Sequence, residues 1–299
     1  MSHPTRREFL KQTAAGALAG PGLFTAITQE YHFFIPIGVC TSIDNAAIAI
    51  KAGCGYIEEG VRRFLMPDRP EDEFKRRLEA ARACGLPVLA CNSFLPGSLK
   101  STGPEADHDG VLRFAETAFR RADEAGVQII VFGSSGSRNI PEGFDRQQAR
   151  DQFVSLLRRM GPLADSAGVT IAIEPLQRSE CNFINTMREG SSIVKEVDHP
   201  SIRLLADIFH MMREDEGPED LGSGGSEMLV HLHIAEKADR TPPGTAGDDF
   251  TPWFKALEQM RYEGLLSIEC GWTDLEAQLP EAVQTVRDHL DFVSSGYVA

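Results

Sequence analysis

The segment "AGVTIAIEP", Ala167–Pro175, gives the clearest indication of the fold. A glycine follows a polar helical segment, the run Val169–Ile173 is mostly apolar, and the run stops at a charged residue, Glu174, that Pro175 follows. Glycine commonly ends a helix, and a short continuous apolar run is typical of a strand covered on both faces. The stretch therefore predicts a helix, a turn and a buried parallel strand that carries an acid at its carboxyl end.

The same arrangement recurs along the chain. Regular instances are Ala52–Gly60, Ala83–Ser93, Ala125–Ser135 and Glu263–Trp272, and less regular ones are Ile35–Ser42, Pro200–His210 and Glu227–Glu236. Amphipathic helices are expected between them, as in Glu71–Ala83, Asp109–Ala125 and Arg146–Ala167, with helix-ending glycines at Gly85, Gly126 and Gly168. Eight strand-and-helix units predict an α/β fold of the (β/α)8 TIM barrel type. A doubly wound open sheet is disfavoured because no Gly-rich G-x-G-x-x-G turn follows the first strand.

Composition narrows the range of partners. The 299 residues are 42% hydrophobic and 25% charged, as in globular proteins, and the formal net charge is −14. Such a charge repels phosphodiester backbones, so nucleic acid is not expected as a partner. It also counts mildly against a heavily phosphorylated substrate. A neutral small molecule is favoured.

The first thirty residues have a different character. Arg6 and Arg7 precede Phe9 and Leu10, and the weakly apolar, Ala/Gly-rich stretch Thr13–Thr28 follows. This order is typical of a twin-arginine export signal, with a basic amphipathic first helix as the alternative. We expect residues 1–30 to be the signal and residues 31–299 to form one barrel domain, which is periplasmic or otherwise exported and not held in a membrane. A cytoplasmic protein is the alternative.

Polar residues collect at the predicted carboxyl ends of the strands, where barrel enzymes place their active sites. They are Glu58, Glu59, Asn92, Ser134, Ser135, Glu174, Asp207, His233 and Glu269. The last four come from the fifth to eighth strands in succession, and all are metal-ligand types. Two Glu, one Asp and one His favour Mn²⁺, Mg²⁺ or Co²⁺ over a structural zinc. Any one acid could instead cap a helix, and His231 or His233 could be a hydrogen-bonded core residue.

A family resemblance rests on four motifs. They are "AIEPLQRSECNFINT" from Ala172, "LLADIFHM" from Leu204, "HLHIAEKADR" from His231 and "SIECGW" from Ser267. From about residue 35 onward the chain resembles the sugar phosphate isomerase/epimerase-like family with a xylose isomerase-like TIM barrel. It is most similar to the ketose 3-epimerases that act on D-tagatose and D-psicose, and to hydroxypyruvate isomerases.

The resemblance implies a set of roles. Glu174, Asp207, His233 and Glu269 would bind one divalent cation, with manganese the first expectation and magnesium or cobalt the alternatives. Glu174 and Glu269 would also be the catalytic proton-transfer pair. The residues Glu180, His210 and Arg240 match positions that bind substrate. Arg240 lies one residue further from His233 than in the 3-epimerases, and "CGW" after Glu269 departs from their Pro and Phe.

The expected activity is that of a metal-dependent sugar isomerase or epimerase. A proton beside a carbonyl would move through an enediolate, on a non-phosphorylated ketose or keto-sugar. One alternative is a lyase or dehydratase on the same scaffold, for example one that eliminates from a 3-keto-glycoside. Another is a non-catalytic exported sugar-binding protein. A homodimer or homotetramer is left open, and Arg138 is expected to be solvated, with substrate contact as its alternative.

Overall fold

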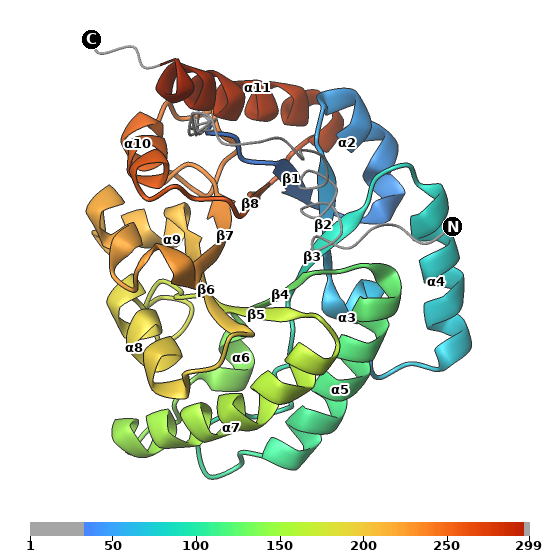
Figure 1. The fold of residues 1–299 in the computed structure, drawn as a ribbon, viewed down its shortest axis with the longest axis vertical. Coiled ribbons are helices and arrows are strands. Elements are labelled where there is room, and N and C mark those ends of the chain that lie inside the picture. The colour runs from blue at the N-terminus through green and yellow to red at the C-terminus, as the bar shows by residue number, and fades with distance from the viewer. Residues whose placement is uncertain (1–32, 296–299) are drawn as a thin grey trace, which may run out of the picture. The chain divides into compact units, whose positions relative to one another are not determined.

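Eight parallel strands form a closed barrel in the order of the chain (Figure 1). The computed structural model describes residues 33–295. The strands are β1 (Ile37–Cys40), β2 (Tyr56–Gly60), β3 (Val88–Asn92), β4 (Ile129–Phe132), β5 (Thr170–Ile173), β6 (Ile202–Asp207), β7 (Leu229–Ile234) and β8 (Leu265–Ile268). Each strand pairs with its neighbours in sequence, and β1 pairs with β8 to close the ring. The predicted (β/α)8 architecture is confirmed.

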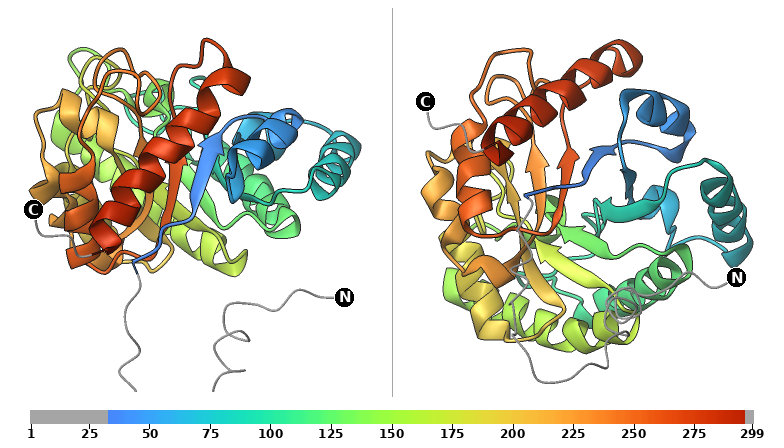
Figure 2. Two further views of the ribbon diagram at one scale, coloured as in Figure 1. Left: turned by 90° about the horizontal axis from the view of Figure 1, so that it is seen from above. Right: turned by 45° about the horizontal axis from the view of Figure 1, so that its top comes forward.

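Helices surround the barrel on its outer side (Figure 1). They are α2 (Ala46–Ala52), α3 (Val61–Phe64), α4 (Glu71–Ala83), α5 (His108–Ala125), α6 (Ser135–Arg138), α7 (Arg146–Ser166), α8 (Met187–Val197), α9 (Ile208–Arg213), α10 (Thr251–Gln259) and α11 (Leu275–Ser294). Short 3-10 turns are η1 (Ile43–Asn45), η2 (Pro218–Gly222) and η3 (Ser226–Met228). The last helix, α11, lies beside the first described one, α2, so the ring of helices closes where the strands do (Figure 2).

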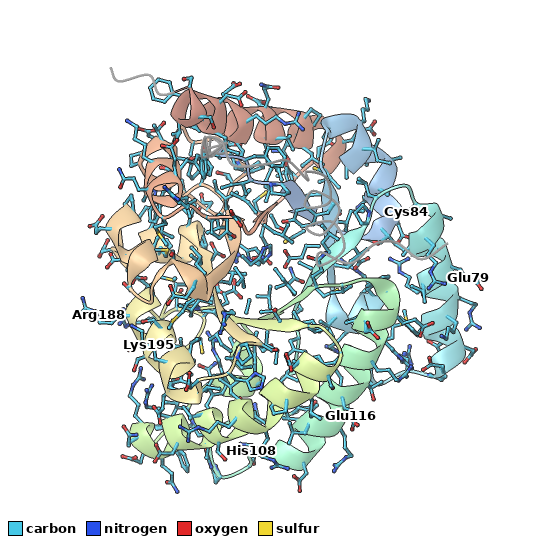
Figure 3. The ribbon with its side chains drawn as sticks, in the orientation of Figure 1. Glu79, Cys84, His108, Glu116, Arg188 and Lys195 are labelled. Carbon is cyan, nitrogen blue, oxygen red and sulfur yellow. The ribbon has the colours of Figure 1, made fainter. Side chains whose placement is uncertain are left out.

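The helix boundaries follow the signals in the sequence. The predicted helix Glu71–Ala83 coincides with α4, and α5 and α7 differ from their predictions by one residue each. Gly85, Gly126 and Gly168 have φ of 89°, 79° and 65°, the left-handed conformation that glycine adopts without a Cβ clash. Outward helix faces carry charges, as Glu79, Glu116, Arg188 and Lys195 show in Figure 3. Within residues 33–295, no helix combines the length and apolar character needed to cross a bilayer.

The interior of the barrel has an apolar half and a polar half. Because side chains alternate along a strand, every second residue points inward. The strands β3 to β6 contribute a buried apolar cluster: Ala90, Ile129, Val131, Ala172 and Leu205. The strands β2, β7 and β8 contribute hydrogen-bonded polar side chains: Tyr56, Glu58, His231, His233 and Ser267. Burying these polar groups is tolerable only because they are paired, so this half of the lumen is built for more than packing.

A glycine in β1 makes room for the polar half. A Cβ on Gly38 would lie 2.3 Å from the ring of Tyr56 in the neighbouring strand. The Tyr56 hydroxyl passes over that glycine to Ser267 of β8, with 2.9 Å between the two oxygens. The predicted export signal at residues 1–30 and its boundary with the barrel lie outside the described residues.

Candidate metal centre

The four predicted ligands meet at the carboxyl ends of the strands. Glu174 follows β5, Asp207 ends β6, His233 lies in β7 and Glu269 follows β8. One donor atom from each of the four lies within 4.8 Å of all the others. Three carboxylates and one imidazole form a hard, oxygen-rich donor set of the kind that Mn²⁺, Mg²⁺ or Co²⁺ prefers. The residues therefore fit one divalent cation.

His233 is the most enclosed member of the centre. Its Nδ1 lies 2.8 Å from Glu269 Oε2 and 3.3 Å from Glu174 Oε1, and its side chain is fully buried. Burial alone lowers the pKa of His233, but the carboxylates of Glu269 and Glu58 outweigh burial and raise that pKa well above its usual range. A cation at Nδ1 would take the place of that proton, so metal binding and proton release are coupled here.

Arg240 contacts two of the candidate ligands. Its Nη2 donates to Asp207 Oδ2 at 2.8 Å and to Glu269 Oε2 at 2.6 Å. The guanidinium carbon also lies 4.9 Å from the centre of the Phe209 ring, a cation–π distance. Both Asp239 and Arg240 have a left-handed backbone, with φ of 55° and 53°, and Gly271 donates its N–H to the Arg240 carbonyl at 2.8 Å. The loop therefore holds Arg240 in a strained conformation at the centre.

Glu269 is held as a carboxylate. Asn92 Nδ2 donates to its Oε1 at 2.9 Å, while Arg240 donates to its Oε2. Burial opposes ionisation, but His233 and Arg240 together lower the pKa of Glu269 to about 2. An ionised carboxylate beside an open cavity can accept a proton from a bound molecule.

The two other predicted substrate residues lie on the same side of the centre. His210 Nε2 is 3.5 Å from Asp207 Oδ2 and 4.0 Å from Glu180 Oε2. Glu180 is oriented by Gln177, whose amide donates to its Oε1 at 2.6 Å. His210 Nδ1 is buried and has no hydrogen-bond partner within the part of the chain that the structure describes. Both side chains line the cavity that opens over the centre.

A cavity of about 280 Å³ opens over these groups. Its charged wall consists of Glu174, Glu180, His210, Arg240 and Glu269. The remaining lining residues are Asn92, Ser93, Leu95, Leu176 and the segment 133–136. Asp207 and His233 are fully buried beneath the cavity and are absent from its lining. A bound molecule would meet Glu174 and Glu269 directly.

The prediction for Arg138 is wrong. Its side chain is fully buried, neither solvated nor exposed to the cavity. Its guanidinium donates to the carbonyl oxygens of Phe132 at 2.9 Å and Glu174 at 2.6 Å, and more weakly to that of Ile184 at 3.5 Å. Arg138 therefore ties the ends of β4 and β5 together and fixes the backbone that carries Glu174.

Other supporting residues had no assigned role in the sequence. A Cβ on Gly133 would lie 2.1 Å from Glu174 Oε2, so only glycine leaves the space that this carboxylate occupies. Glu58 accepts hydrogen bonds from His231 and His233, and these two histidines lower its pKa well below the usual range against the opposing effect of burial. Glu58 and Asn92 were visible as polar strand ends, but Gly133 had no signal beyond its place at a strand end.

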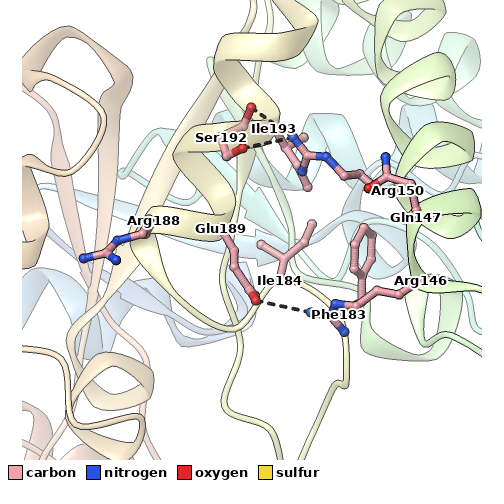
Figure 4. A pocket seen from close by; sticks show the side chains of 9 residues that line it. All are labelled: Arg146, Gln147, Arg150, Phe183, Ile184, Arg188, Glu189, Ser192 and Ile193. Carbon is pink, nitrogen blue, oxygen red and sulfur yellow. Dashed lines mark hydrogen bonds and ion pairs between the residues drawn. The ribbon is translucent and has the colours of Figure 1, made fainter.

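A second cavity lies on the outer surface, between α7 and α8, as Figure 4 shows. Arg146 donates to Glu189 at 3.2 Å and Arg150 to Ser192 at 3.0 Å across this groove. The apolar floor is formed by Phe183, Ile184 and Ile193. None of the candidate ligands lines it, so it is separate from the centre at the strand ends.

A closed parallel barrel whose last four strands converge on three carboxylates and an imidazole defines the class: a TIM barrel with a candidate centre for one divalent cation. The chain belongs to the xylose isomerase-like TIM barrel family, whose model matches residues 46–293. The resemblance predicted from the four motifs is confirmed, since its relatives include D-psicose 3-epimerases and proteins named as hydroxypyruvate isomerases.

Three relatives and one solved structure illustrate the similarity. The L-ribulose 3-epimerase of Methylomonas sp. is 32% identical over 41% of this chain and 43% of its own length. A protein named probable ketose 3-epimerase from Synechocystis sp. is 37% identical over 62% of this chain and 64% of its own. The matched segments thus span under two thirds of these two relatives.

The 3-dehydro-D-guloside 4-epimerase of Escherichia coli is 28% identical over 64% of this chain and 74% of its own length. Among solved structures, the 3-keto-D-glucoside 4-epimerase of E. coli superposes with a TM-score of 0.73, at 19% identity, over 85% of this chain and 100% of that one. Identity this low shows a shared fold. The sequence relatives named here are epimerases and isomerases.

Proposed function

We propose that the protein is a divalent-metal-dependent isomerase or epimerase that moves a proton beside the carbonyl of a non-phosphorylated ketose or keto-sugar. The observation that carries the proposal is the position of Glu174 and Glu269. Both belong to the four-residue centre, and both line the same cavity. Two carboxylates that share a cation and face one bound molecule can act as a base and an acid in turn.

The residues divide the chemistry between them. When bound, a divalent cation supplies the electrophile that stabilises negative charge on neighbouring substrate oxygens. One of the two carboxylates, Glu174 or Glu269, removes the proton from carbon, and an enediolate of the sugar results. The other carboxylate returns a proton from its own side, which inverts the carbon. Return to the neighbouring carbon would instead exchange the aldose and the ketose.

The charged wall of the cavity supports a neutral substrate. Three carboxylates face the cavity. The positive charge in the cavity lining comes from Arg240, which is already paired with Asp207 and Glu269. A phosphate dianion placed here would meet net negative charge in a partly desolvated site. Hydroxyl groups of a sugar, by contrast, can donate to Glu180 and accept from His210.

A keto-glycoside is a second candidate substrate. The 3-dehydro-D-guloside 4-epimerase of E. coli matches over most of its own length, more than the two ketose 3-epimerases do. The cavity is also lined by the small polar residues Ser93, Ser134 and Ser135, which leave space and hydrogen-bonding groups for a second ring. The same base acting on a keto-glycoside could also start an elimination, which would make the enzyme a lyase.

One experiment separates these candidates. The full-length protein, freed of metal and reloaded with Mn²⁺ or Mg²⁺, is incubated in D₂O with a panel of ketoses, aldoses and 3-keto-glycosides. Deuterium incorporation is measured by mass spectrometry, and the products are resolved by chromatography. Deuterium in a new isomer supports the proposal, and loss of water or aglycone supports the lyase. If a sugar binds without deuterium exchange, and Glu269→Gln binds it with the same affinity, the protein is a binding protein and the proposed enzymatic function is wrong.

We also propose, from the sequence alone, that the chain is exported by the twin-arginine pathway. The proposal rests on Arg6 and Arg7 and the weakly apolar stretch that follows them. Replacing both arginines by lysine should keep the protein in the cytoplasm of a bacterial host, as measured by cell fractionation. Equal periplasmic amounts of the two forms would contradict export by this route.

A further inference from the structure

A buried acid on the far side of the barrel lumen holds the imidazole of the candidate centre. Glu58 lies in β2 and is 1% exposed. Its Oε1 is 3.0 Å from Nε2 of His233, and its Oε2 is 2.7 Å from Nε2 of His231. Each oxygen of the Glu58 carboxylate thus contacts one histidine of β7. In the closed barrel, the strands β1 and β8 lie between β2 and β7.

The contacts determine which nitrogen of His233 faces the centre and which one keeps its hydrogen when a cation is bound. A carboxylate offers acceptors only, so a ring nitrogen facing it at 3.0 Å donates an N–H. In a neutral imidazole the other nitrogen then has the free lone pair. That other nitrogen is Nδ1, which faces Glu269 at 2.8 Å and Glu174 at 3.3 Å. Without a cation, Nδ1 also donates to these carboxylates. When a cation takes the place of that hydrogen, the contact with Glu58 keeps the remaining hydrogen on Nε2 and leaves Nδ1 directed at the centre.

The neighbouring acid shows that burial alone does not produce this arrangement. Glu59 is also fully buried, but the alternation of the strand turns it outward, toward the helices. Its oxygens accept from Arg63 at 2.6 Å, Arg77 at 2.9 Å and the backbone of Ile43 at 3.0 Å. Glu58 and Glu59 are therefore chemically matched neighbours, and only Glu58 contacts the centre.

We infer that Glu58 is a positioning residue that sets the affinity of the centre for its cation, by holding His233 with Nε2 protonated and Nδ1 directed at Glu174 and Glu269. The inference rests on the metal dependence in the proposed function and adds a residue that is not itself one of the four ligands. A partner of this kind on a ligating histidine typically changes metal affinity by about 10- to 100-fold.

Glu58→Gln is the decisive variant because it keeps the shape of the side chain. A glutamine can accept from one histidine through its oxygen, but its NH₂ group must then face the other. Where the NH₂ faces His233, Nε2 becomes the acceptor and Nδ1 carries the hydrogen, which blocks binding. Where it faces His231, Nε2 of His231 becomes the acceptor and its Nδ1 can donate to the Leu265 carbonyl, 3.3 Å away. His233 is then held by a neutral amide oxygen, which is a weaker acceptor than a carboxylate. Glu59→Gln is the matched control.

The experiment titrates Mn²⁺ into full-length protein that has been freed of metal, and measures free Mn²⁺ by its electron paramagnetic resonance signal. Glu58→Gln should weaken binding by about 10- to 100-fold, Glu59→Gln should bind within about twofold of the unchanged protein, and His233→Asn should bind most weakly. Circular dichroism checks that each variant is folded. Equal affinity of Glu58→Gln and the unchanged protein would overturn the inference.

A measurement on the unchanged protein covers the case in which Glu58→Gln fails to fold. Nitrogen-15 spectra of the histidine rings, assigned with His233→Asn, should show a proton on Nε2 of His233 and a metal-induced shift at Nδ1 when Zn²⁺ is added. A shift at Nε2 would overturn the inference. If Glu58→Gln weakens Mn²⁺ binding but no sugar takes up deuterium, the positioning role of Glu58 is supported and only the proposed reaction is contradicted.

Discussion

The two halves of the barrel contribute different kinds of group at the carboxyl ends of the strands. The ends of β5 to β8 supply Glu174, Asp207, His233 and Glu269, whose donor atoms converge. The ends of β2 to β4 supply groups that touch those residues: Glu58 on His233, Asn92 on Glu269, and Gly133 and Arg138 on Glu174. The second half of the barrel provides the candidate ligands, and the first half holds them in place.

This difference between the two halves shows that the position of a candidate ligand depends on residues other than the ligand itself. A ligand needs only its own side chain at a strand end, whereas its geometry depends on several neighbours from distant parts of the chain. Carboxylates crowded together repel one another unless cations, N–H donors and steric limits fix them. The largest losses should therefore come from the half that provides the candidate ligands, and graded losses should come from the supporting half.

The largest effect is expected for Glu269→Gln, in the half that provides the candidate ligands. In the proposed function, the change removes one member of the proton-transfer pair and a metal ligand, while the amide keeps the shape. The turnover number should fall by about 10³-fold, within the range found for removing a general base. Steady-state rates with the substrate from the deuterium screen would measure it. The control is Glu276→Gln, because Glu276 lies on α11 and its side chain is 65% exposed. Equal rates for the two variants would contradict a special role for the strand ends of β5 to β8.

Gly133→Ala should produce the next largest effect, from the supporting half. The new Cβ would lie 2.1 Å from Glu174 Oε2, so the carboxylate must move by about 1 Å. A displacement of that size can cost about 100-fold in rate. Turnover and Mn²⁺ affinity should both fall, whereas Gly222→Ala, where a Cβ meets nothing within 4 Å, should leave both unchanged. Normal turnover in Gly133→Ala would show that Glu174 tolerates movement.

Arg138→Met should lower stability by about 2 kcal/mol, because buried carbonyls of Phe132 and Glu174 lose their donor. Urea unfolding of the folded variant measures the loss. Arg138→Lys keeps one charged donor and should recover part of the stability. Arg63→Met is the comparison, since the side chain of Arg63 is 55% exposed and its partner Glu59 faces away from the centre. Equal stability of Arg138→Met and the unchanged protein would mean that this link is dispensable.

The smallest effect concerns an acid outside both halves. Glu216 accepts the N–H of Met187, which begins α8, at 2.9 Å. Burial raises the pKa of Glu216 from 4.5 to about 7, although the hydrogen bond from Met187 acts in the opposite direction. Since the folded protein holds this proton more tightly than the unfolded chain, its contribution is present below pH 4.5 and is lost as the pH rises through 7.

Unfolding free energy should therefore fall between pH 5 and pH 8 by at most about 1 kcal/mol from this group, given its partial exposure. Glu216→Gln should flatten that dependence in urea titrations at several pH values. The turnover number of Glu216→Gln should match that of the unchanged protein. Glu216 would then affect stability without affecting the candidate metal centre. A pH dependence that persists in Glu216→Gln would assign it to another group.

The sequence predicted the barrel, which the structure confirms, and four candidate ligands, which the structure brings together, but it did not predict the residues that support them. Periodicity and glycine placement locate the strands and helices, and Glu174, Asp207, His233 and Glu269 stand alone at four successive strand ends. Glu58 and Glu59, in contrast, are identical neighbours, and only the direction of the pleat decides which one faces the lumen. Arg138 lies in a Gly/Ser segment typical of a solvated loop, and its partners are backbone carbonyls, which have no signature in sequence.

The contact of Glu58 with β7 also has a consequence for folding kinetics. Its two hydrogen bonds join residues separated by 173 and 175 positions in the chain. Contacts this distant in sequence are slow to form because the chain between them must first be ordered. Since Glu58 reaches His233 across the lumen, we expect the imidazole to be oriented fully only in a barrel whose β2 and β7 are both in place. Tight metal binding would then report that the barrel has been assembled.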